Sequence, residues 1–434
     1  NDTTSSDAPP PIPVDRFWIQ KLLQKHPNPN ARRMDKALVV APMVDQSDLP
    51  FRLLCRKYGS NLCFTPMIHS RLLLETEAYR KKFFTTDFDR PIIAQLCGSE
   101  PDTVLKAAKL LEPYVDGIDI NCGCPQGIAR RGNYGAYLLE QEDTLLTLVK
   151  HLVKHLKVPL SVKVRLLPKP SIPTSTTVAA DGAAPENEFD IPKASLSLYS
   201  KLVDAGIHLL TIHGRTRKQK GPETGQTDWK TIRKAVDLFG DRIPIFANGS
   251  IQEFDDVDEC LNVTNADGVM SSESVLEYPP LFYKIPQTPV RTVGRVQLAE
   301  EYMELAKQHP PNEGGQGSGL KCMRVHLHRF LHADLQGDIE LRKLLVQTKT
   351  LEALEVALAN CKKWHGNTNH DVASESLSWY VRHQAGDDDG DDKGETKEEA
   401  TNVGEGAPAD EETDVDQGME NAACLFGGEE KGDY

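Results

Sequence analysis

The sequence predicts a closed barrel of eight parallel strands, a (β/α)8 TIM barrel, followed by a smaller all-α domain. Two observations support it. Eight short segments are almost continuously apolar, as strands buried on both faces must be, and segments of helical period lie between them. An open, doubly wound sheet is the alternative. Such a sheet would show a glycine-rich loop after its first strand, where this chain instead reads Met43-Val-Asp-Gln.

The eight expected strands share an apolar, β-branched composition, and they lie at 37–43, 61–67, 91–97, 117–120, 159–165, 207–213, 243–249 and 266–271. The first helix after the first strand should begin at Ser47 or Asp48, which can cap it, with Pro50 in its first turn. Further helices are expected at 102–111, 141–156, 192–205, 229–238 and 253–261. This regular alternation is typical of βα units.

The chain divides into four expected parts: a partly disordered N-terminal extension (1–34) with a short helix at 17–25, the barrel (35–285), a helical domain (292–384) and a tail (385–434). Within the barrel, the stretch 168–190 is rich in Pro, Ser, Thr, Ala and Gly and has no apolar period. It is expected to be a surface loop on the fifth βα connection. That connection lies on the side where barrels carry their sites.

Charge separates the tail from the rest of the chain. The net charge of the 434 residues is -14, yet residues 386–434 hold 18 acidic and 3 basic residues and so carry -15, which leaves +1 for residues 1–385. The tail also has few large apolar residues and is expected to be disordered.

The nine cysteines are scattered and odd in number, which favours a reducing compartment, the cytoplasm or also the nucleus. We expect a monomer. We also expect no membrane segment, since no run of eighteen apolar residues occurs.

Polar residues stand at the ends of the apolar strands, where a barrel carries its chemistry. A structural role is open for each one alone, but together they favour a bound polar ligand, because a buried polar side chain needs a partner. The amide of Gln95 can pair with a ligand edge that both donates and accepts, and Lys163 can stabilise an anionic ring edge. The ends of strands seven and eight can hold a phosphate. A flavin mononucleotide (FMN) fits this set.

Metal binding is not expected. His213-Gly-Arg215 has no second histidine or carboxylate at ligand spacing, and Cys122-x-Cys124 lacks two further ligands in register. Considered by themselves, the two cysteines are also consistent with a purely structural role as small, buried apolar residues.

Several motifs together resemble the tRNA-dihydrouridine synthase family. They occur in the family's order: Ala41-Pro-Met43, Ala94-Gln-Leu96, Asp119-Ile-Asn-Cys-Gly-Cys-Pro125, Ser161-Val-Lys-Val-Arg165, Ile212-His-Gly-Arg-Thr216 and Ala247-Asn-Gly249. The resemblance covers the barrel and is weaker in the helical domain. The Gly-Cys-Pro-Gln motif, with Arg130-Arg131-Gly after it, resembles the corresponding motif of the eukaryotic branch of the family, which acts on positions 16 and 17 of the tRNA D-loop.

The resemblance implies a reaction and residues for it. The family reduces the C5=C6 bond of a uridine in tRNA with FMN that NADPH recharges, placing a hydride on C6 and a proton on C5. By motif position Cys124 is the proton donor, and a thiol with a pKa near ~8.5 is mostly protonated at neutral pH. Asn121 would lie beside flavin and substrate, while Cys122 stays structural. The implied FMN-binding residues are Pro42, Met43, Gln95, Lys163, His213, Asn248 and Gly249.

The phosphate end departs from the family pattern. Many relatives have Gly-Arg after strand eight, where this chain has Ser272-Glu273. An inward Glu would repel the phosphate, so backbone N–H groups and the Ser272 hydroxyl are expected to hold it.

Contacts to tRNA are expected from local basic clusters, because the body of the chain is nearly neutral. The candidates are Arg130, Arg131, Arg215, Arg217, Lys218, Arg324 and Arg329. The helical domain, which contains Arg324 and Arg329, is expected to be a tRNA-binding domain. Two other functions remain open: a small-molecule flavin barrel of the dihydroorotate or dihydropyrimidine dehydrogenase kind, and a tRNA-binding or chaperone protein whose catalysis is dispensable.

Overall fold

The computed structural model describes residues 15, 17–24, 35–81, 86–168, 190–219, 224–283, 293–311, 319–332, 335 and 339–367. The interior of the expected loop at 168–190, the residues between the expected barrel and the expected helical domain, and the acidic tail lie outside the described residues.

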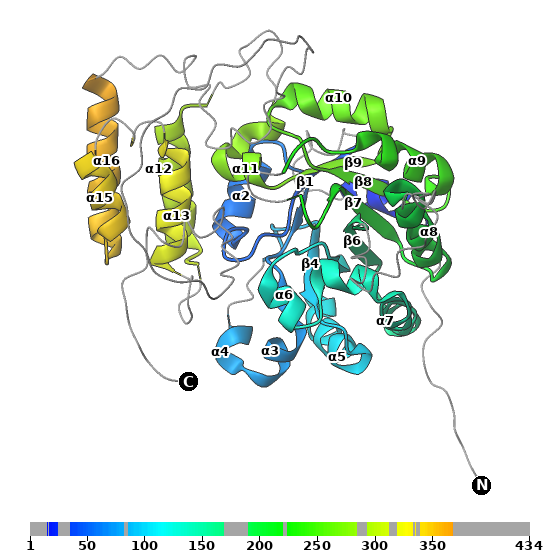
Figure 1. The fold of residues 1–434 in the computed structure, drawn as a ribbon. Coiled ribbons are helices and arrows are strands. Elements are labelled where there is room, and N and C mark those ends of the chain that lie inside the picture. The colour runs from blue at the N-terminus through cyan, green and yellow to red at the C-terminus, as the bar shows by residue number, and fades with distance from the viewer. Residues whose placement is uncertain are drawn as a thin grey trace, which may run out of the picture.

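The predicted (β/α)8 TIM barrel is confirmed (Figure 1). Its eight strands are β1 (Ala37–Val40), β2 (Leu62–Phe64), β4 (Ile92–Cys97), β5 (Gly117–Cys122), β6 (Leu160–Leu166), β7 (Leu209–Thr216), β8 (Ile245–Asn248) and β9 (Gly268–Ser271). Every pairing is parallel, and the sheet closes because β1 pairs with both β2 and β9 while β2 also pairs with β4. A short strand that the sequence did not predict, β3 (Ile68–His69), extends the sheet beside β4.

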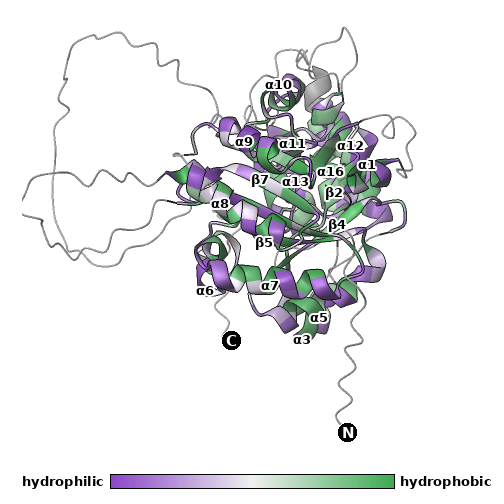
Figure 2. Ribbon diagram, turned by 90° about the vertical axis from the view of Figure 1, so that its right-hand side faces the viewer, coloured by the Kyte–Doolittle hydropathy of each residue, from purple (hydrophilic) through white to green (hydrophobic). Residues whose placement is uncertain are grey.

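The helices around the barrel follow the predicted alternation. They are α2 (Leu49–Lys57), α3 (Ser70–Glu75), α4 (Glu77–Arg80), α5 (Pro101–Leu111), α6 (Gly127–Arg131), α7 (Glu142–His155), α8 (Ile191–Asp204), α9 (Trp229–Phe239), α10 (Phe254–Thr264) and α11 (Glu273–Glu277). Caps set several of their starts: the carboxylate of Asp190 accepts a hydrogen bond from the N–H of Lys193, and that of Asp228 from Thr231. Figure 2 shows hydrophobic strands inside and hydrophilic outer helix faces.

The N-terminal extension contributes to the barrel core. Helix α1 (Trp18–Leu23) buries Trp18, Ile19 and Leu23 in one cluster with Ala37, Phe246 and other residues of the barrel interior. The indole N–H of Trp18 donates to the carbonyl of His208, just before β7, at 2.6 Å. Helix α1 therefore covers the end of the barrel where the strands begin, and the opposite end stays available for a site.

A set of four helices follows the barrel: α12 (Arg295–Gln308), α13 (Leu320–Phe330), α15 (Ile339–Gln347) and α16 (Leu351–Asn367). Helix α12 packs on α2 and α13 packs on α11, so this helical domain lies beside the first and last βα units (Figure 1). Its attachment includes a buried ion pair between Arg295 and Glu277 at 3.2 Å. None of the described helices combines the length and apolar character that a membrane span requires.

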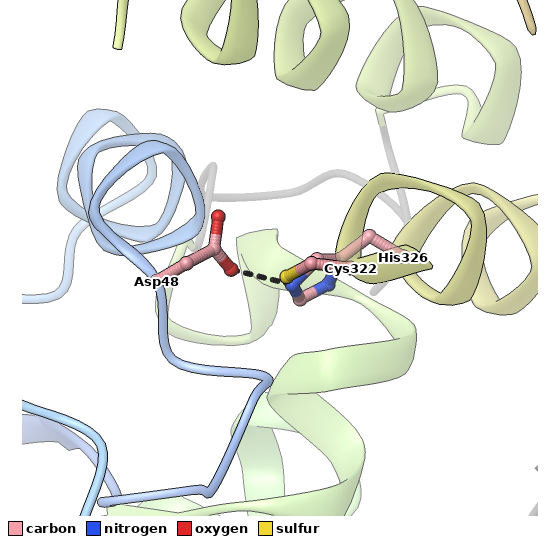
Figure 3. A group of neighbouring side chains, drawn as sticks. All are labelled: Asp48, Cys322 and His326. Carbon is pink, nitrogen blue, oxygen red and sulfur yellow. Dashed lines mark hydrogen bonds and ion pairs between the residues drawn. The ribbon is translucent and has the colours of Figure 1, made fainter. Parts of the chain in front are cut away.

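Asp48 joins the two parts near the carboxyl end of β1. It occupies the N-cap position of α2 as expected, yet its side chain makes no cap hydrogen bond. It instead accepts a hydrogen bond from His326 Nε2 at 2.7 Å (Figure 3). It also accepts one from the hydroxyl of Tyr302 at 3.2 Å. Burial opposes ionisation of Asp48, but His326 and Arg52 hold the pKa of the carboxyl below its usual value. Asp48, Cys322 and His326 form a group of three potential metal ligands, whose ligand atoms all lie within 4.8 Å of one another. The direct hydrogen bond between Asp48 and His326 accounts for this grouping without an ion.

The role of α1 in the core can be tested by truncating its fully buried side chain. Ile19→Ala should lower the free energy of unfolding by about 2–5 kcal/mol, because it leaves a cavity among packed residues. Phe17→Ala, at a position that is 61% exposed, should change it by less than about 0.5 kcal/mol. Chemical denaturation of both variants makes the measurement. Equal stabilities would show that α1 is not part of the cooperative core.

Candidate active site at the barrel mouth

Strand register brings the predicted polar residues to one end of the barrel. Asn121 on β5 lies beside Lys163 on β6, and His213 on β7 lies beside Asn248 on β8. Gln95 on β4 is paired with Asp119 one layer lower on β5. Because all eight strands run parallel, these positions meet at the carboxyl end, where α/β barrels carry their sites.

The side-chain amide of Asn121 connects the barrel interior to the cysteine loop. Its nitrogen donates to Gln95 Oε1 at 2.9 Å, and Gln95 Nε2 in turn donates to Asp119 Oδ2 at 2.8 Å. Its oxygen accepts from the backbone N–H groups of Gly123 at 2.9 Å and Cys124 at 3.0 Å. The amide thereby fixes the loop in which Cys124 stands. Gln95, which is 1% exposed, still has one amide N–H and one carbonyl lone pair to offer.

Lys163 is a cation in a poorly hydrated place. Burial, and to a smaller extent Arg165, lower the pKa of its ammonium to about 8, against the opposing effects of Asp119 and Cys124. No described residue accepts a hydrogen bond from this ammonium. Burial also raises the pKa of Asp119 to about 6, against the effects of Ser161, Gln95 and Lys163. A half-buried ammonium without a protein acceptor among the described residues suits an anionic or electron-rich ligand.

Cys124 differs from the other described cysteines in its exposure. It is half-buried at the mouth, and its thiol lies 3.8 Å from Gln126 Oε1, to which it donates. Cys122 is fully buried and faces the layer between barrel and helices, and burial raises the pKa of its thiol. The remaining described cysteines are also buried: Cys55, Cys63, Cys97, Cys260, Cys322 and Cys361. Cys124 alone among them can meet a ligand at the mouth.

The ends of β7 and β8 are joined by Arg215. Its guanidinium donates to Ser250 Oγ at 2.9 Å and lies 3.2 Å from His213 Nε2, which must accept because a guanidinium has only donors. Gly249 beside them has a φ of +110°, and a Cβ there would lie 2.5 Å from Thr227 Oγ1. Only glycine fits this close turn. Arg215 is 3% exposed, so its expected role as a surface contact for tRNA has no support in its position.

The other expected residues are distributed more widely. Pro42, Met43 and Ser272 are half-buried at the mouth, and Asn248 Nδ2 donates to the carbonyl of Met270 at 2.9 Å. Among the basic residues that were predicted to contact tRNA, Arg130, Arg131 and Lys218 are exposed. Arg217 forms an ion pair with Glu140, Arg324 donates to the carbonyls of Val346 and Thr348, and Arg329 is half-buried. Their roles in binding stay predictions.

Arg165 is a site residue that the sequence analysis placed in a motif without assigning it a role. Its Nε donates to the carbonyl of Gly123 at 2.9 Å and its Nη1 to that of Thr216 at 3.0 Å, so it links the cysteine loop to the end of β7. The signal was present in the sequence. Lys163 and Arg165 are two residues apart on one strand, and such residues point to the same face.

A parallel barrel with an ammonium, an amide network and a thiol at its mouth has the architecture of a barrel enzyme. The comparisons with known proteins name the class more closely. The profile of the dihydrouridine synthase family matches residues 39–182 and 187–366. The chain belongs to the dihydrouridine synthase family.

Relatives with curated names share this family. A protein of Mus musculus named tRNA-dihydrouridine(16/17) synthase [NAD(P)(+)]-like is 40% identical over 322 residues, which cover 73% of this chain and 59% of that protein. The tRNA-dihydrouridine(16/17) synthase [NAD(P)(+)] of Schizosaccharomyces pombe is 36% identical over 314 residues, covering 71% and 72%. The Saccharomyces cerevisiae protein of the same name is 35% identical over 314 residues, covering 71% and 68%. The match thus spans less than two thirds of the mouse relative.

The lowered pKa of Lys163 predicts a dependence of stability on pH. From about pH 8 to 10.5 the unfolded chain keeps this proton and the folded chain loses it, so the wild type should gain stability with rising pH. Lys163→Met should not show this gain. At pH 7 its free energy of unfolding should be roughly 1–3 kcal/mol higher than that of the wild type. Lys201→Met, which removes an exposed lysine paired with Glu142, is the control. Parallel pH profiles for wild type and Lys163→Met would contradict the assignment.

Proposed function

We propose that this protein is a flavin-dependent tRNA-dihydrouridine synthase that reduces the C5=C6 bond of D-loop uridines, at positions 16 and 17, with NADPH as reductant. Family membership and the names of the relatives support the reaction and its substrate. The observation that carries the proposal is the position of Cys124. Its thiol is half-buried, whereas the other described cysteines are buried. It lies at the barrel mouth, near the cations Lys163 and Arg165.

FMN, when bound, supplies the hydride that C6 receives. The residues at the mouth fit this group: the ammonium of Lys163 has no acceptor among the described residues, and Gln95 keeps one donor and one acceptor. Gly249 lets the backbone after β8 pack closely against Thr227, where any Cβ would collide. We assign Lys163, Gln95, His213 and Asn248 to the flavin, together with Pro42, Met43, Gly249 and Ser272.

The Cys124 thiol gives its proton to C5 of the uridine, which completes the C–H bonds at both carbons. The thiolate that remains lies in the field of Lys163 and Arg165, and nearby cations favour the charged form of a thiol. Asn121 holds the backbone N–H of Cys124 and so keeps the thiol at the mouth during this step. The chain's own contribution is thus a positioned acid with two cations beside it.

Glu273 changes the expectation for the phosphate end. Its negative charge raises the pKa of both Arg215 and Arg165, against the larger lowering effect of burial, so the carboxylate interacts favourably with two cations. These arginines offset the repulsion that Glu273 would exert on a phosphate. We keep the Ser272 hydroxyl and neighbouring backbone N–H groups as its holders.

For the tRNA we assign the exposed cations of the mouth loops, Arg130, Arg131 and Lys218, and with them Arg324 and Arg329 of the helical domain. A uridine must leave its stack to reach a barrel mouth, and such a flipped base is read by the pocket that receives it. We further propose that the protein is a monomer. We also propose that it lies in the cytoplasm or nucleus, a location that the eight described free cysteines support.

The acid role of Cys124 can be tested against its neighbour. Cys124→Ala should lower dihydrouridine formation by about 10²–10⁴-fold, the range for loss of a general acid, while bound flavin remains reducible by NADPH. Cys122→Ala is the matched control and should affect stability more than rate, because that thiol is buried away from the mouth. Mass spectrometry of the tRNA gives the product and flavin absorbance gives the reduction. A fully active Cys124→Ala would remove the assignment.

The assignment of Arg130 and Arg131 predicts a salt effect. Replacing both by Gln should weaken tRNA binding and reduce the slope of log Kd against log salt by about 1 for each phosphate that the protein no longer neutralises. The control is Lys201→Gln, which removes an exposed cation on α8 that pairs with Glu142 on α7. Filter binding over a range of potassium chloride gives the slopes. Unchanged slopes in the double variant would exclude these arginines from the interface.

A further inference from the structure

Arg217 was expected to contact tRNA, yet the structure engages it within the protein. Its Nε lies 2.7 Å from Glu140 Oε1, and its Nη2 donates to Glu140 Oε2 at 3.2 Å. The guanidinium also lies over the ring of Tyr137, 4.8 Å from the centroid. A guanidinium placed in this way gains both an ion pair and a cation–π contact. Arg217 belongs to the loop after β7, while Glu140 and Tyr137 belong to the turn η3 (Gly135–Glu140).

Tyr137 carries this contact to the reactive loop. Its hydroxyl donates to the carbonyl of Pro125, the residue directly after Cys124, at 3.2 Å. The first turn of η3 also touches the cysteine, because Ala136 N–H donates to the carbonyl of Cys124 at 2.9 Å. At Gly135, with a φ of +68°, a Cβ would lie 2.6 Å from that same carbonyl. The turn η3 and the backbone of Cys124 are therefore in close contact.

The cysteine loop is thus held from two sides. Arg165 bonds the carbonyl of Gly123 on one side of Cys124, and Tyr137 bonds Pro125 on the other. Arg217 and Glu140 connect Tyr137 to the loop after β7, through the contacts described above.

We propose that Arg217 is a positioning residue for the Cys124 thiol: paired with Glu140 and stacked on Tyr137, it holds the loop through the bond from Tyr137 to Pro125. Its effect on loop geometry is independent of the reaction. Its effect on proton transfer to the uridine rests on the proposed function.

The proposal and a role in tRNA binding differ in the effect expected for Glu140. If Arg217 positions the loop, Glu140→Gln weakens its hold and slows the chemical step. If Arg217 instead contacts a phosphate, Glu140→Gln removes a competing acid and tightens tRNA binding. The two roles therefore predict effects of this substitution on different quantities: a slower chemical step with an unchanged Kd for tRNA, or a tighter Kd for tRNA.

The first experiment measures alkylation of Cys124 by iodoacetamide in the flavin-loaded protein, with peptide-resolved mass spectrometry to separate it from the other thiols. Tyr137→Phe removes only a hydroxyl and leaves all charges in place. It should change the alkylation rate about three- to tenfold, because loss of one hydrogen bond loosens the loop by that factor. Arg217→Gln should produce a change in the same direction.

The double variant Tyr137→Phe, Arg217→Gln should show no more than the larger single effect, since both changes break one chain of contacts. Lys201→Gln, which breaks the ion pair with Glu142 on another side of the barrel, should alkylate at the wild-type rate. Thermal melting confirms that all variants are folded. Additive effects in the double variant, or wild-type rates in both single variants, would overturn the proposal.

The second experiment measures single-turnover reduction of tRNA by pre-reduced enzyme, with the tRNA Kd measured separately. Arg217→Gln, Glu140→Gln and Tyr137→Phe should each lower the rate about three- to tenfold and leave the Kd unchanged. A weaker Kd for Arg217→Gln together with a tighter Kd for Glu140→Gln would overturn the positioning role. If the wild type makes no dihydrouridine, the proposed function fails, whereas the alkylation result still decides the contact between Arg217 and the loop.

Discussion

The organisation of the site depends on the side-chain amide of Asn121. One amide group donates into the barrel, toward Gln95, and accepts from the backbone of the loop that carries Cys124. An amide can do both at once because its nitrogen has only donors and its oxygen only acceptors. An ionised carboxylate at this position would lose the hydrogen bond donated to Gln95, because it has only acceptors. The placement of the thiol relative to Lys163 and Gln95 follows from this residue.

The mouth of the barrel is rich in charges that the protein does not fully compensate. Burial lowers the pKa of Lys163 to about 8 and that of Arg165 and Arg215 to about 10, and it raises that of Asp119 to about 6. Each shift means that the fold is less stable with that charge than without it. Groups of this kind cluster where a ligand or a reaction needs them. The apolar barrel and helix α1 provide the stability that tolerates them.

The helical domain is attached at the same end of the barrel. Asp48 follows the loop after β1 and binds His326 and Tyr302, so α12 and α13 are held next to the mouth and not next to the end covered by α1. The rings of Phe51, Tyr302 and Phe330 surround this histidine. A hydrogen-bonded acid and imidazole within aromatic packing define one orientation of the two parts, because a shift would leave both groups buried without partners.

The sequence by itself determined the barrel, its eight strands and the position of the polar residues at their ends. Strands buried on both faces must be apolar, so Gln95, Lys163 and His213 were conspicuous in them. Burial and partnership across distant segments were decided only by the tertiary structure. Neither local pattern nor charge distinguishes Arg215, buried against His213, from exposed Lys218, or shows that Arg217 meets Glu140 from 77 residues away. Such contacts arise when separate loops close over one mouth, and their geometry is set by the register of the strands beneath them.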